Sequence, residues 1–415
     1  MSTKVVGFIL FCVLTCANCQ VTFNFDPEES VEFRSDENRV VNITISSHND
    51  TLDLPILFKC SNAQSCVIKA NKDKIILESA NNFTEELSIY IHGIFIGNNK
   101  LIVVLNDSEE VQHFQIRVKR SEYESKVSLV FGSFATVFVV TITFLIGTQI
   151  EFRRMMTIMK RPVGPMCGFF CQFFFMPLIG FSLSYYLMAD AENSMKLALF
   201  AVAVSPGGGK SSFWTIIFDG NLDLSVCMTF IETVSAIIMT PLWMYTLGSV
   251  FFDEHIYVPI EKFAQSLATV LIPTMLGTLL IQIRPDLVDR IKVLIKYFTW
   301  FLVIVLTAVG IYANYYIFAF ITWRIVLASC LLPWTGYIIA FLFALLMHQN
   351  TQNAITIAIE TGIQNVGIAF TIMFYTFPEF ERDIAMVVPI AVVLVTDKPL
   401  FVIWLVKKFF FKNKQ

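Results

Sequence analysis

The residues best suited to chemistry are polar side chains that stand inside apolar sequence. The segment Glu360 to Asn365 reads Glu-Thr-Gly-Ile-Gln-Asn and lies within the mainly apolar stretch Ile355 to Phe377. An ionised carboxylate at membrane depth costs about 2.5 to 3.5 kcal/mol on insertion scales, so Glu360 needs a partner. A sodium ion is one such partner, because carboxylate, amide and carbonyl oxygens suit a hard cation.

A second polar segment, Ser205 to Ser212, reads Ser-Pro-Gly-Gly-Gly-Lys-Ser-Ser and lies within the apolar stretch Met195 to Phe218. Proline removes a backbone donor and the glycines relax the backbone, so we expect a helix to break here. The end of this segment matches the end of a nucleotide-binding P-loop, but Val204 stands where that motif needs its first glycine. We therefore exclude nucleotide binding.

Hydroxyl groups follow on the next predicted helix. Ser225 and Thr229 are four residues apart, which places both side chains on one helix face. Glu232 comes three residues after Thr229 on the same face. Hydroxyl oxygens also suit a hard cation.

The elements that must position these groups are membrane helices. The chain has 415 residues, 55% of them apolar, with 41 Phe and a mean hydropathy of +0.65, which excludes a soluble globule. A net charge of -3 without a basic stripe excludes a nucleic-acid binder. Apolar windows of about 20 residues predict nine spans: Val127 to Ile150, Val163 to Ala189, Met195 to Phe218, Leu222 to Gly248, Pro259 to Ile283, Val293 to Tyr312, Ile325 to Met347, Ile355 to Phe377 and Ile384 to Val406.

Two of these spans repeat one another. The segments Met176 to Phe181 and Leu332 to Tyr337 share a Pro-x-x-Gly-aromatic pattern. Because the two spans run in opposite directions, the pattern indicates an inverted-repeat transporter, in which broken helices place free backbone groups at a central site. The alternative is independent use of Pro and Gly, which are both frequent in membrane helices.

Loop charges predict the orientation. With an outer N-terminus, an odd number of spans places the C-terminal tail, residues 409–415, in the cytoplasm. The predicted inner loops are basic and the predicted outer loops are acidic, as the positive-inside rule requires. The inner residues include Arg153, Arg154, Lys160, Arg284 and Lys407, and the outer residues include Asp190, Glu192, Asp253, Glu379 and Asp383.

The N-terminal part of the chain differs from the rest. Residues 1–19 have the charged start, short apolar run and small-residue end of a secretory signal peptide, with cleavage near Cys19. Residues 20–125 alternate polar and apolar side chains in short runs, which predicts a small extracellular β-sandwich. Residues 126–408 then form the transporter domain.

Two kinds of modification are expected in the extracellular domain. The membrane spans and the signal peptide contain every other cysteine, so we expect a disulfide between Cys60 and Cys66 in the oxidising compartment. Asn-x-Ser/Thr sequons predict glycosylation at Asn42, Asn49, Asn82 and Asn106.

Together these motifs resemble the bile acid:sodium symporter family, solute carrier family 10. The resemblance covers roughly Leu129 to Lys408. It is strongest in three motifs that occur in the family's order: Gln172 to Pro177, Ser205 to Ser212 followed by Gly220 to Thr229, and Glu360 to Asn365. A secreted, glycosylated domain before nine spans resembles the P3-like members of that family.

The resemblance implies nine transmembrane helices with inverted repeats, in which two broken helices cross beside two sodium sites. By position, the first sodium site would use Ser211, Ser212, Ser225, Thr229 and Glu360. The second would use Gln172, Glu360 and Gln364 with the backbone carbonyls of Thr361 and Ile363. The organic substrate would contact Gly208, Gly209 and Asn365.

Three residues depart from the family's pattern. Ser212 replaces an asparagine of the first site, Lys210 stands where small or polar residues are usual, and Glu232 adds a carboxylate. Our hypothesis is that the Lys210 ammonium either pairs with Glu232 or takes the place of the first sodium ion, which would leave one coupled sodium. The alternative is that Lys210 points into the aqueous vestibule and pairs with nothing.

The function implied by the resemblance is sodium-coupled uptake of an amphipathic organic anion, such as a bile acid or a steroid sulfate-like solute, at the plasma membrane. The partners are then this anion, sodium and the lipid bilayer, with an extracellular partner of the N-terminal domain as a further candidate. No enzymatic chemistry is expected. The rival interpretation is an orphan receptor or adhesion-type glycoprotein whose helical domain no longer transports. An ion channel ranks last, because the sequence has no repeated charged ring or filter-like loop.

Overall fold

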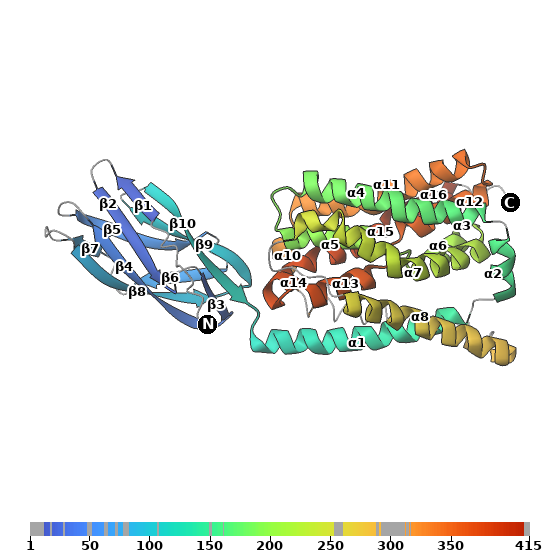
Figure 1. Cartoon of the computed structure of the whole chain (residues 1–415), viewed down its shortest axis with the longest axis horizontal. Helices are drawn as coiled ribbons and strands as arrows, with labels where there is room; N and C mark the ends of the chain where they lie inside the picture. Colours follow the sequence, from blue (N-terminus) through green and yellow to red (C-terminus); the bar gives the residue numbers. More distant parts are fainter. Residues whose placement is uncertain are drawn as a thin grey trace, which may run out of the picture. The chain divides into compact units, whose positions relative to one another are not determined.

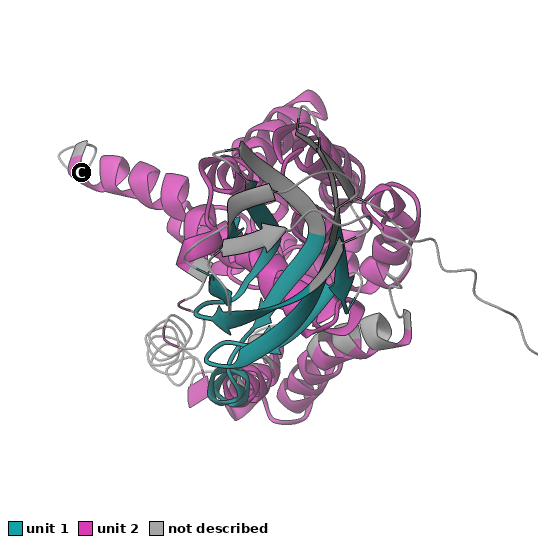
Figure 2. Cartoon of the chain, turned by 90° about the vertical axis from the view of Figure 1, so that its left-hand side faces the viewer, with its two compact units in different colours: residues 1–128 teal, residues 129–415 magenta. Residues whose placement is uncertain are grey.

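The structure is a computed structural model of the whole chain. It describes residues 12–410 except 17–18, 28–29, 48–51, 62–64, 71–73, 78–82, 106–107, 149–151, 161, 253–259, 288–289, 292–311, 313–314 and 316. The chain divides into two compact units, Met1–Ser128 and Leu129–Gln415, which Figure 2 shows in different colours. The division lies close to the predicted boundary at residue 125.

The first unit is built from two β-sheets of five strands each (Figure 1). One sheet has the order β1-β2-β4-β8-β6 and the other the order β3-β10-β9-β5-β7. All the pairs are antiparallel except β3 with β10, which run parallel. The strands are β1 Cys12–Cys16, β2 Cys19–Asp26, β3 Ser30–Arg34, β4 Asn38–Ser47, β5 Leu52–Cys60, β6 Cys66–Ala70, β7 Lys74–Leu77, β8 Phe83–Gly93, β9 Gly97–Leu105 and β10 Ser108–Lys119.

The core of this unit lies between its two sheets. Along β4, Val41, Ile43 and Ile45 are fully buried, whereas Asn42 between them is exposed. This alternation of period two directs one face of the strand into the core. The opposite sheet contributes residues such as Ile116 of β10 to the same cluster. The predicted β domain is therefore confirmed.

Strand β1 lies inside the segment predicted to be a signal peptide. It pairs antiparallel with β2, from Cys12 opposite Phe23 to Cys16 opposite Cys19. The apolar run that predicts a signal peptide is equally suited to an edge strand, so the two interpretations share one sequence pattern. Cleavage near Cys19 stays a prediction.

The predicted modification sites are described only in part. Asn42 is exposed on β4 and its Oδ1 accepts a hydrogen bond of 2.9 Å from Ser88 Oγ. The other three sequons, at Asn49, Asn82 and Asn106, lie outside the described residues.

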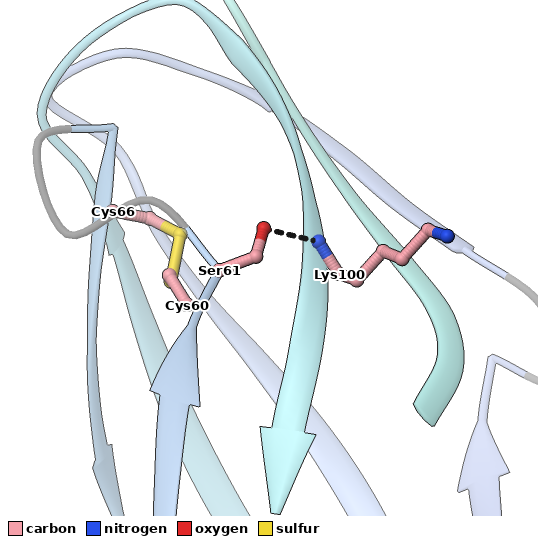
Figure 3. Close-up of a disulfide and its surroundings, with 4 residues drawn as sticks. All are labelled: Cys60, Ser61, Cys66 and Lys100. Carbon is pink, nitrogen blue, oxygen red and sulfur yellow. Dashed lines mark hydrogen bonds between the residues drawn. A yellow bond between two sulfur atoms is a disulfide. The ribbon is translucent and has the colours of Figure 1, made fainter. Parts of the chain in front are cut away.

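A disulfide joins Cys60 at the end of β5 to Cys66 at the start of β6 (Figure 3). Both cysteines are buried in the core cluster of the β domain. Next to the disulfide, Ser61 Oγ accepts a hydrogen bond of 2.9 Å from the backbone N–H of Lys100 on β9. The disulfide thereby links the two sheets, since β5 and β6 belong to different ones.

The second unit is helical. Four helices among the described residues are long and apolar enough to cross a membrane: Val163–Leu187, Leu222–Tyr245, Trp323–Leu346 and Glu379–Phe409. Shorter apolar helices are Asn193–Ala203, Leu271–Ile283 and Val366–Thr376. The predicted span Val293 to Tyr312 lies almost wholly outside the described residues, and the prediction of nine spans is therefore not tested.

Figure 1 labels most of the described helices of this unit. They are α1 Glu122–Gly147, which begins in the first unit, α2 Phe152–Met159, α3 Val163–Phe170, η1 Cys171–Phe175, α4 Met176–Ser182, η2 Leu183–Leu187, α5 Asn193–Ala203, α6 Ser211–Ile217, α7 Leu222–Tyr245, η3 Gly248–Phe251, α8 Ile260–Ile283, η4 Pro285–Leu287, α10 Ile317–Phe320, α11 Trp323–Leu346, α12 Thr351–Gly362, α13 Val366–Thr376, α14 Glu379–Ala385, α15 Val387–Thr396 and α16 Lys398–Phe410.

Polar side chains cap the first turns of several helices, among them α7, α11 and α12. Asn221 accepts a hydrogen bond from the Leu224 N–H at the start of α7, and Asn350 accepts one from the Asn353 N–H at the start of α12. Thr322 does the same for Ile325 at the start of α11. Each side chain satisfies a backbone donor that the first turn of a helix leaves free.

A π-helical turn, η1, precedes Pro177. Proline has no N–H, so it cannot bond to the carbonyl four residues earlier, that of Phe173. The indole N–H of Trp243 on α7 donates to this carbonyl instead, at 2.8 Å. Such turns often occur at functional sites, and this one contains Gln172.

We predict that replacing both Cys60 and Cys66 with serine lowers the free energy of unfolding of the β domain by about 2 kcal/mol, because the crosslink closes a short loop. The measurement is thermal unfolding with and without a reductant. The wild type in reductant should match the double variant. Cys330→Ser, which removes a free cysteine, should leave the difference between the two conditions unchanged.

Candidate functional site

Two helices of the second unit are interrupted at the positions that the sequence predicts. One break separates α5 from α6 over residues 204–210, and the other separates α12 from α13 over residues 363–365. Pro206 and the glycines after it stop the first helix. Proline has no backbone N–H to donate, and glycine destabilises a helix because its flexible backbone loses the most conformational entropy there. Both predicted helix breaks are thus present in the structure.

The two breaks cross and bond to each other. Gly207 and Gln364 form an antiparallel β-bridge. The Gly208 N–H donates to the Ile363 carbonyl at 2.7 Å, and the Asn365 N–H donates to the Pro206 carbonyl at 2.8 Å. Backbone groups freed by one break are therefore satisfied by the other, as a buried break requires.

Glu360 lies in the last turn of α12, next to this crossing, and is fully buried. Ser225 on α7 donates a hydrogen bond to Glu360 Oε2 at 2.8 Å, and Thr229 on the next turn donates to Oε1. The hydroxyl oxygen of Ser212 on α6 lies 3.1 Å from the hydroxyl oxygen of Ser225. Ser211 is close to the same carboxylate, but its buried hydroxyl has no partner at standard hydrogen-bond geometry. The five residues predicted for the first sodium site are thus together.

The residues predicted for the second sodium site also lie together. Gln172 Nε2 donates to Gln364 Oε1 at 2.7 Å and to the carbonyl of Ser205. Gln364 Nε2 donates to the Thr361 carbonyl at 2.5 Å. Gln172 is fully buried and Gln364 almost so, and each amide is bonded on both sides. The Ile363 carbonyl, in contrast, belongs to the backbone crossing.

The residues predicted to contact the organic substrate border the crossing. Gly208 is buried against the Gln364 carbonyl, where an added Cβ would come within 2.7 Å of that oxygen. Gly209 is exposed and Asn365 is half-buried. Two of the three residues are therefore accessible to a ligand.

The structure corrects the prediction for Lys210. Its ammonium group forms an ion pair with Asp397, at the end of α15, with 2.9 Å between Nζ and Oδ2. The Lys210 side chain is 44% exposed, which removes most of the cost of burying its charge. The predictions that Lys210 pairs with Glu232, replaces a sodium ion or pairs with nothing are therefore wrong.

Glu232 is buried on α7 without a cationic partner among the described residues. Its Oε2 accepts a hydrogen bond of 3.1 Å from the Gly207 N–H. Its Oε1 has no hydrogen-bond partner within the part of the chain that the structure describes. The second unit thus contains a carboxylate that the pattern of two sodium sites does not use.

Gly207 is the residue that the sequence analysis missed. A Cβ at this position would lie 2.6 Å from Glu232 Oε2 and 2.9 Å from Glu360 Oε1. Both distances are shorter than contacts that real Cβ atoms make, so a side chain at this position would have to displace the end of at least one of the two glutamates. The run of three glycines signals a break, but it does not say which glycine is required.

Comparisons of the sequence with known proteins point to one family of symporters. The profile of the Sodium Bile acid symporter family matches residues 136–322. The chain is similar to the Ileal sodium/bile acid cotransporter of Homo sapiens, with 28% identity over 279 residues that cover 66% of this chain and 78% of that protein.

Two other relatives come from Rattus norvegicus. The Sodium-dependent organic anion transporter is 29% identical over 261 residues, which cover 62% of this chain and 68% of that protein. The Hepatic sodium/bile acid cotransporter is 30% identical over 237 residues, which cover 56% and 65%. Among solved structures, domains 4 and 5 of the S-layer protein SbsC match with a TM-score of 0.19 and 9% identity over 26% of this chain and 53% of that chain, which supports no argument.

We predict that Gly207→Ala destabilises the helical unit by about 1 to 3 kcal/mol, the usual effect of overpacking a buried site. The added methyl group must displace Glu232 or Glu360. Thermal unfolding of the purified protein in detergent measures the change. The control is Gly132→Ala on α1, where an added Cβ meets no atom within 4 Å. An equal loss of stability in both variants would contradict the prediction.

Proposed function

We propose that this chain belongs to the sodium bile acid symporter family, whose profile it matches over residues 136–322, and that it couples sodium entry to the uptake of an amphipathic organic anion, such as a bile acid or a steroid sulfate-like solute. The relatives named above include cotransporters of sodium with bile acids and a sodium-dependent transporter of organic anions. The family consists of transporters, so the chain is not an enzyme.

The observation that carries the proposal is the environment of Glu360. The carboxylate is fully buried and receives hydrogen bonds from two hydroxyl groups of α7. No lysine or arginine among the described residues pairs with it. An ionised carboxylate buried in a protein is paired or binds a metal ion, and the surrounding oxygens suit a hard cation. Sodium is the cation of this kind that the named relatives carry.

The first sodium ion is assigned to the hydroxyl side of Glu360. Ser225 and Thr229 each turn one hydroxyl oxygen toward the carboxylate, and Ser212 lies next to Ser225. Ser211 adds a buried hydroxyl that has no other partner within the described residues. These groups come from α6, α7 and α12, so an ion bound here would hold three helices together.

The second sodium ion is assigned to the amide side of Glu360. It would take the Thr361 carbonyl and the side-chain oxygens of Gln172 and Gln364, with the carbonyl of Ile363. The Thr361 carbonyl and Gln172 Oε1 accept hydrogen bonds from Gln364 Nε2, at 2.5 and 3.3 Å. An ion at this position would take the place of the Gln364 amide nitrogen as the partner of the Thr361 carbonyl and of Gln172 Oε1. Its binding therefore requires the Gln364 side chain to rotate.

Sodium binding supplies the driving force. Each sodium ion that enters down the membrane potential contributes about 2.3 kcal/mol per 100 mV. A cation can only shift the protein toward the state that binds it better, so sodium would favour the outward-facing state that also binds the substrate near Asn365. The substrate would then cross the membrane as a core bundle, formed by predicted spans two to four and seven to nine, rocks against a panel formed by predicted spans one, five and six.

The arrangement in the membrane is part of the same proposal. Nine transmembrane helices with inverted repeats would place the β domain outside the cell and the C-terminus in the cytoplasm. The β domain would then be glycosylated, and the protein would resemble the P3-like members at the plasma membrane. The basic inner loops and acidic outer loops support this orientation.

We predict that cells or proteoliposomes containing the protein take up labelled bile salts or steroid sulfates faster in sodium than in choline. Glu360→Gln should reduce the sodium-dependent part about tenfold or more, because a charged ligand is lost. Glu261→Gln is the control, since Glu261 is exposed on α8. Equal uptake in both salts for every anion tested would refute the proposed coupling.

A separate prediction concerns Lys210. Because its ammonium is held by Asp397 and not by Glu360 or Glu232, Lys210→Asn should leave the Hill slope for sodium unchanged. The slope comes from uptake measured against sodium concentration at constant ionic strength. A steeper slope in the variant would mean that the ammonium occupies a sodium site, against the position that the structure gives it.

A further inference from the structure

The carboxylate of Glu232 has no part in the two sodium sites described above. Glu232 is 1% exposed and lies on α7, one turn after Thr229. One of its oxygens accepts a hydrogen bond from the Gly207 N–H, and the other, Oε1, has none within the described residues. A buried oxygen without a partner is unfavourable in a folded protein, so this position calls for a ligand.

The carboxylates of Glu232 and Glu360 converge on one residue. The space where a Cβ of Gly207 would stand is 2.6 Å from Glu232 Oε2 and 2.9 Å from Glu360 Oε1. The two oxygens therefore lie close to the same side of Gly207, one from α7 and the other from α12. Two ionised carboxylates this near each other repel, unless a positive charge lies with them.

The groups that face this pair are all uncharged. Ser225 and Thr229 come from α7, Ser211 comes from α6, and the Cys171 thiol comes from η1. On α3, a Cβ at Gly168 would come within 3.3 Å of Glu232 Oε1, so the backbone there is close but offers no charge. Lys210, the nearest cation in the sequence, is occupied by Asp397. Within the described residues no side chain compensates the two negative charges.

We propose that Glu232 is a further cation ligand, and that it shares one sodium ion with Glu360 across Gly207. The inference rests on the proposed sodium coupling and adds a carboxylate to the first site. Two carboxylates balance the charge of two sodium ions, so the loaded crossing is electrically neutral. With Glu360 alone, the second ion would enter a site that the first had already neutralised. Glu232 thus supports the binding of two ions where the chain has Ser212 in place of an amide ligand.

The experiment titrates the purified full-length protein with sodium chloride, replaced by choline chloride to keep the ionic strength constant, and follows the melting temperature. Glu232→Gln keeps the shape of the side chain and its acceptor for Gly207 but removes the charge. We expect this variant to melt higher than wild type without sodium, because one of two repelling charges is gone. We also expect a smaller shift with sodium and a midpoint raised about tenfold.

Three further variants complete the test. Glu232→Asp keeps the charge but shortens its reach, so it should raise the sodium midpoint without raising the melting temperature in choline. It also serves as the second measurement if Glu232→Gln does not fold. Glu360→Gln tests the shared partner. Asp397→Asn is the matched control, since this carboxylate pairs with Lys210 and should leave the sodium midpoint as in wild type.

The outcomes separate this inference from the proposed function. A sodium midpoint and a sodium-free melting temperature equal to wild type in Glu232→Gln would overturn the inference and leave sodium coupling intact. A variant that melts lower at every sodium concentration, with an unchanged midpoint, would mean that Glu232 only packs, which also overturns it. No sodium response in wild type would overturn both. A response lost in Glu232→Gln but kept in Glu360→Gln would overturn the shared site, because the ion would then bind without the Glu360 carboxylate.

Discussion

The hydrogen bonding of the two helix breaks is the constraint on which the rest of this helical unit depends. A break inside an apolar interior leaves backbone donors and acceptors that water cannot satisfy. Here each break uses the other, through the bonds from Gly208 to Ile363 and from Asn365 to Pro206. These bonds require the two backbones to approach closely, and glycine at position 208 leaves room for this. Because α12 ends at the crossing, Glu360 and Gln364 both lie next to it. The pairing of backbone groups between the two breaks thus also sets where the side chains of Glu360 and Gln364 lie.

Much of this could be predicted from local sequence. Pro206 and the glycines after it indicate one break, and the polar segment from Glu360 to Asn365 indicates the other. The spacing of Ser225 and Thr229 places both hydroxyls on one face, where both now bond to Glu360. In the β domain, the alternation along β4 predicts which side chains form the core. Each of these signals acts over a few residues, so a single sequence carries it in full.

Features that depend on distant residues could not be predicted in this way. Lys210 and Asp397 are far apart in the chain and meet only after folding, so the sequence suggests the nearer carboxylate, Glu232, as the partner. The requirement for Gly207 arises from two side chains on two other helices. Strand β1 illustrates a different limit, since a short apolar run satisfies both a signal peptide and an edge strand. The match to the family profile also ends at residue 322, before the segment from Glu360 to Asn365. The assignment of this segment to the site therefore rests on the geometry of the structure.

The bond from Trp243 to the Phe173 carbonyl has a mechanical consequence. A second bond, from the Thr240 hydroxyl to the Val204 carbonyl at 2.6 Å, connects α7 to the end of α5. Separating these helices would break both bonds, at about 0.5 to 1.5 kcal/mol each. The segments η1, α5 and α7 are therefore fastened at the carbonyls that proline and the helix break leave free. These two bonds favour a joint movement of the three segments over their separation.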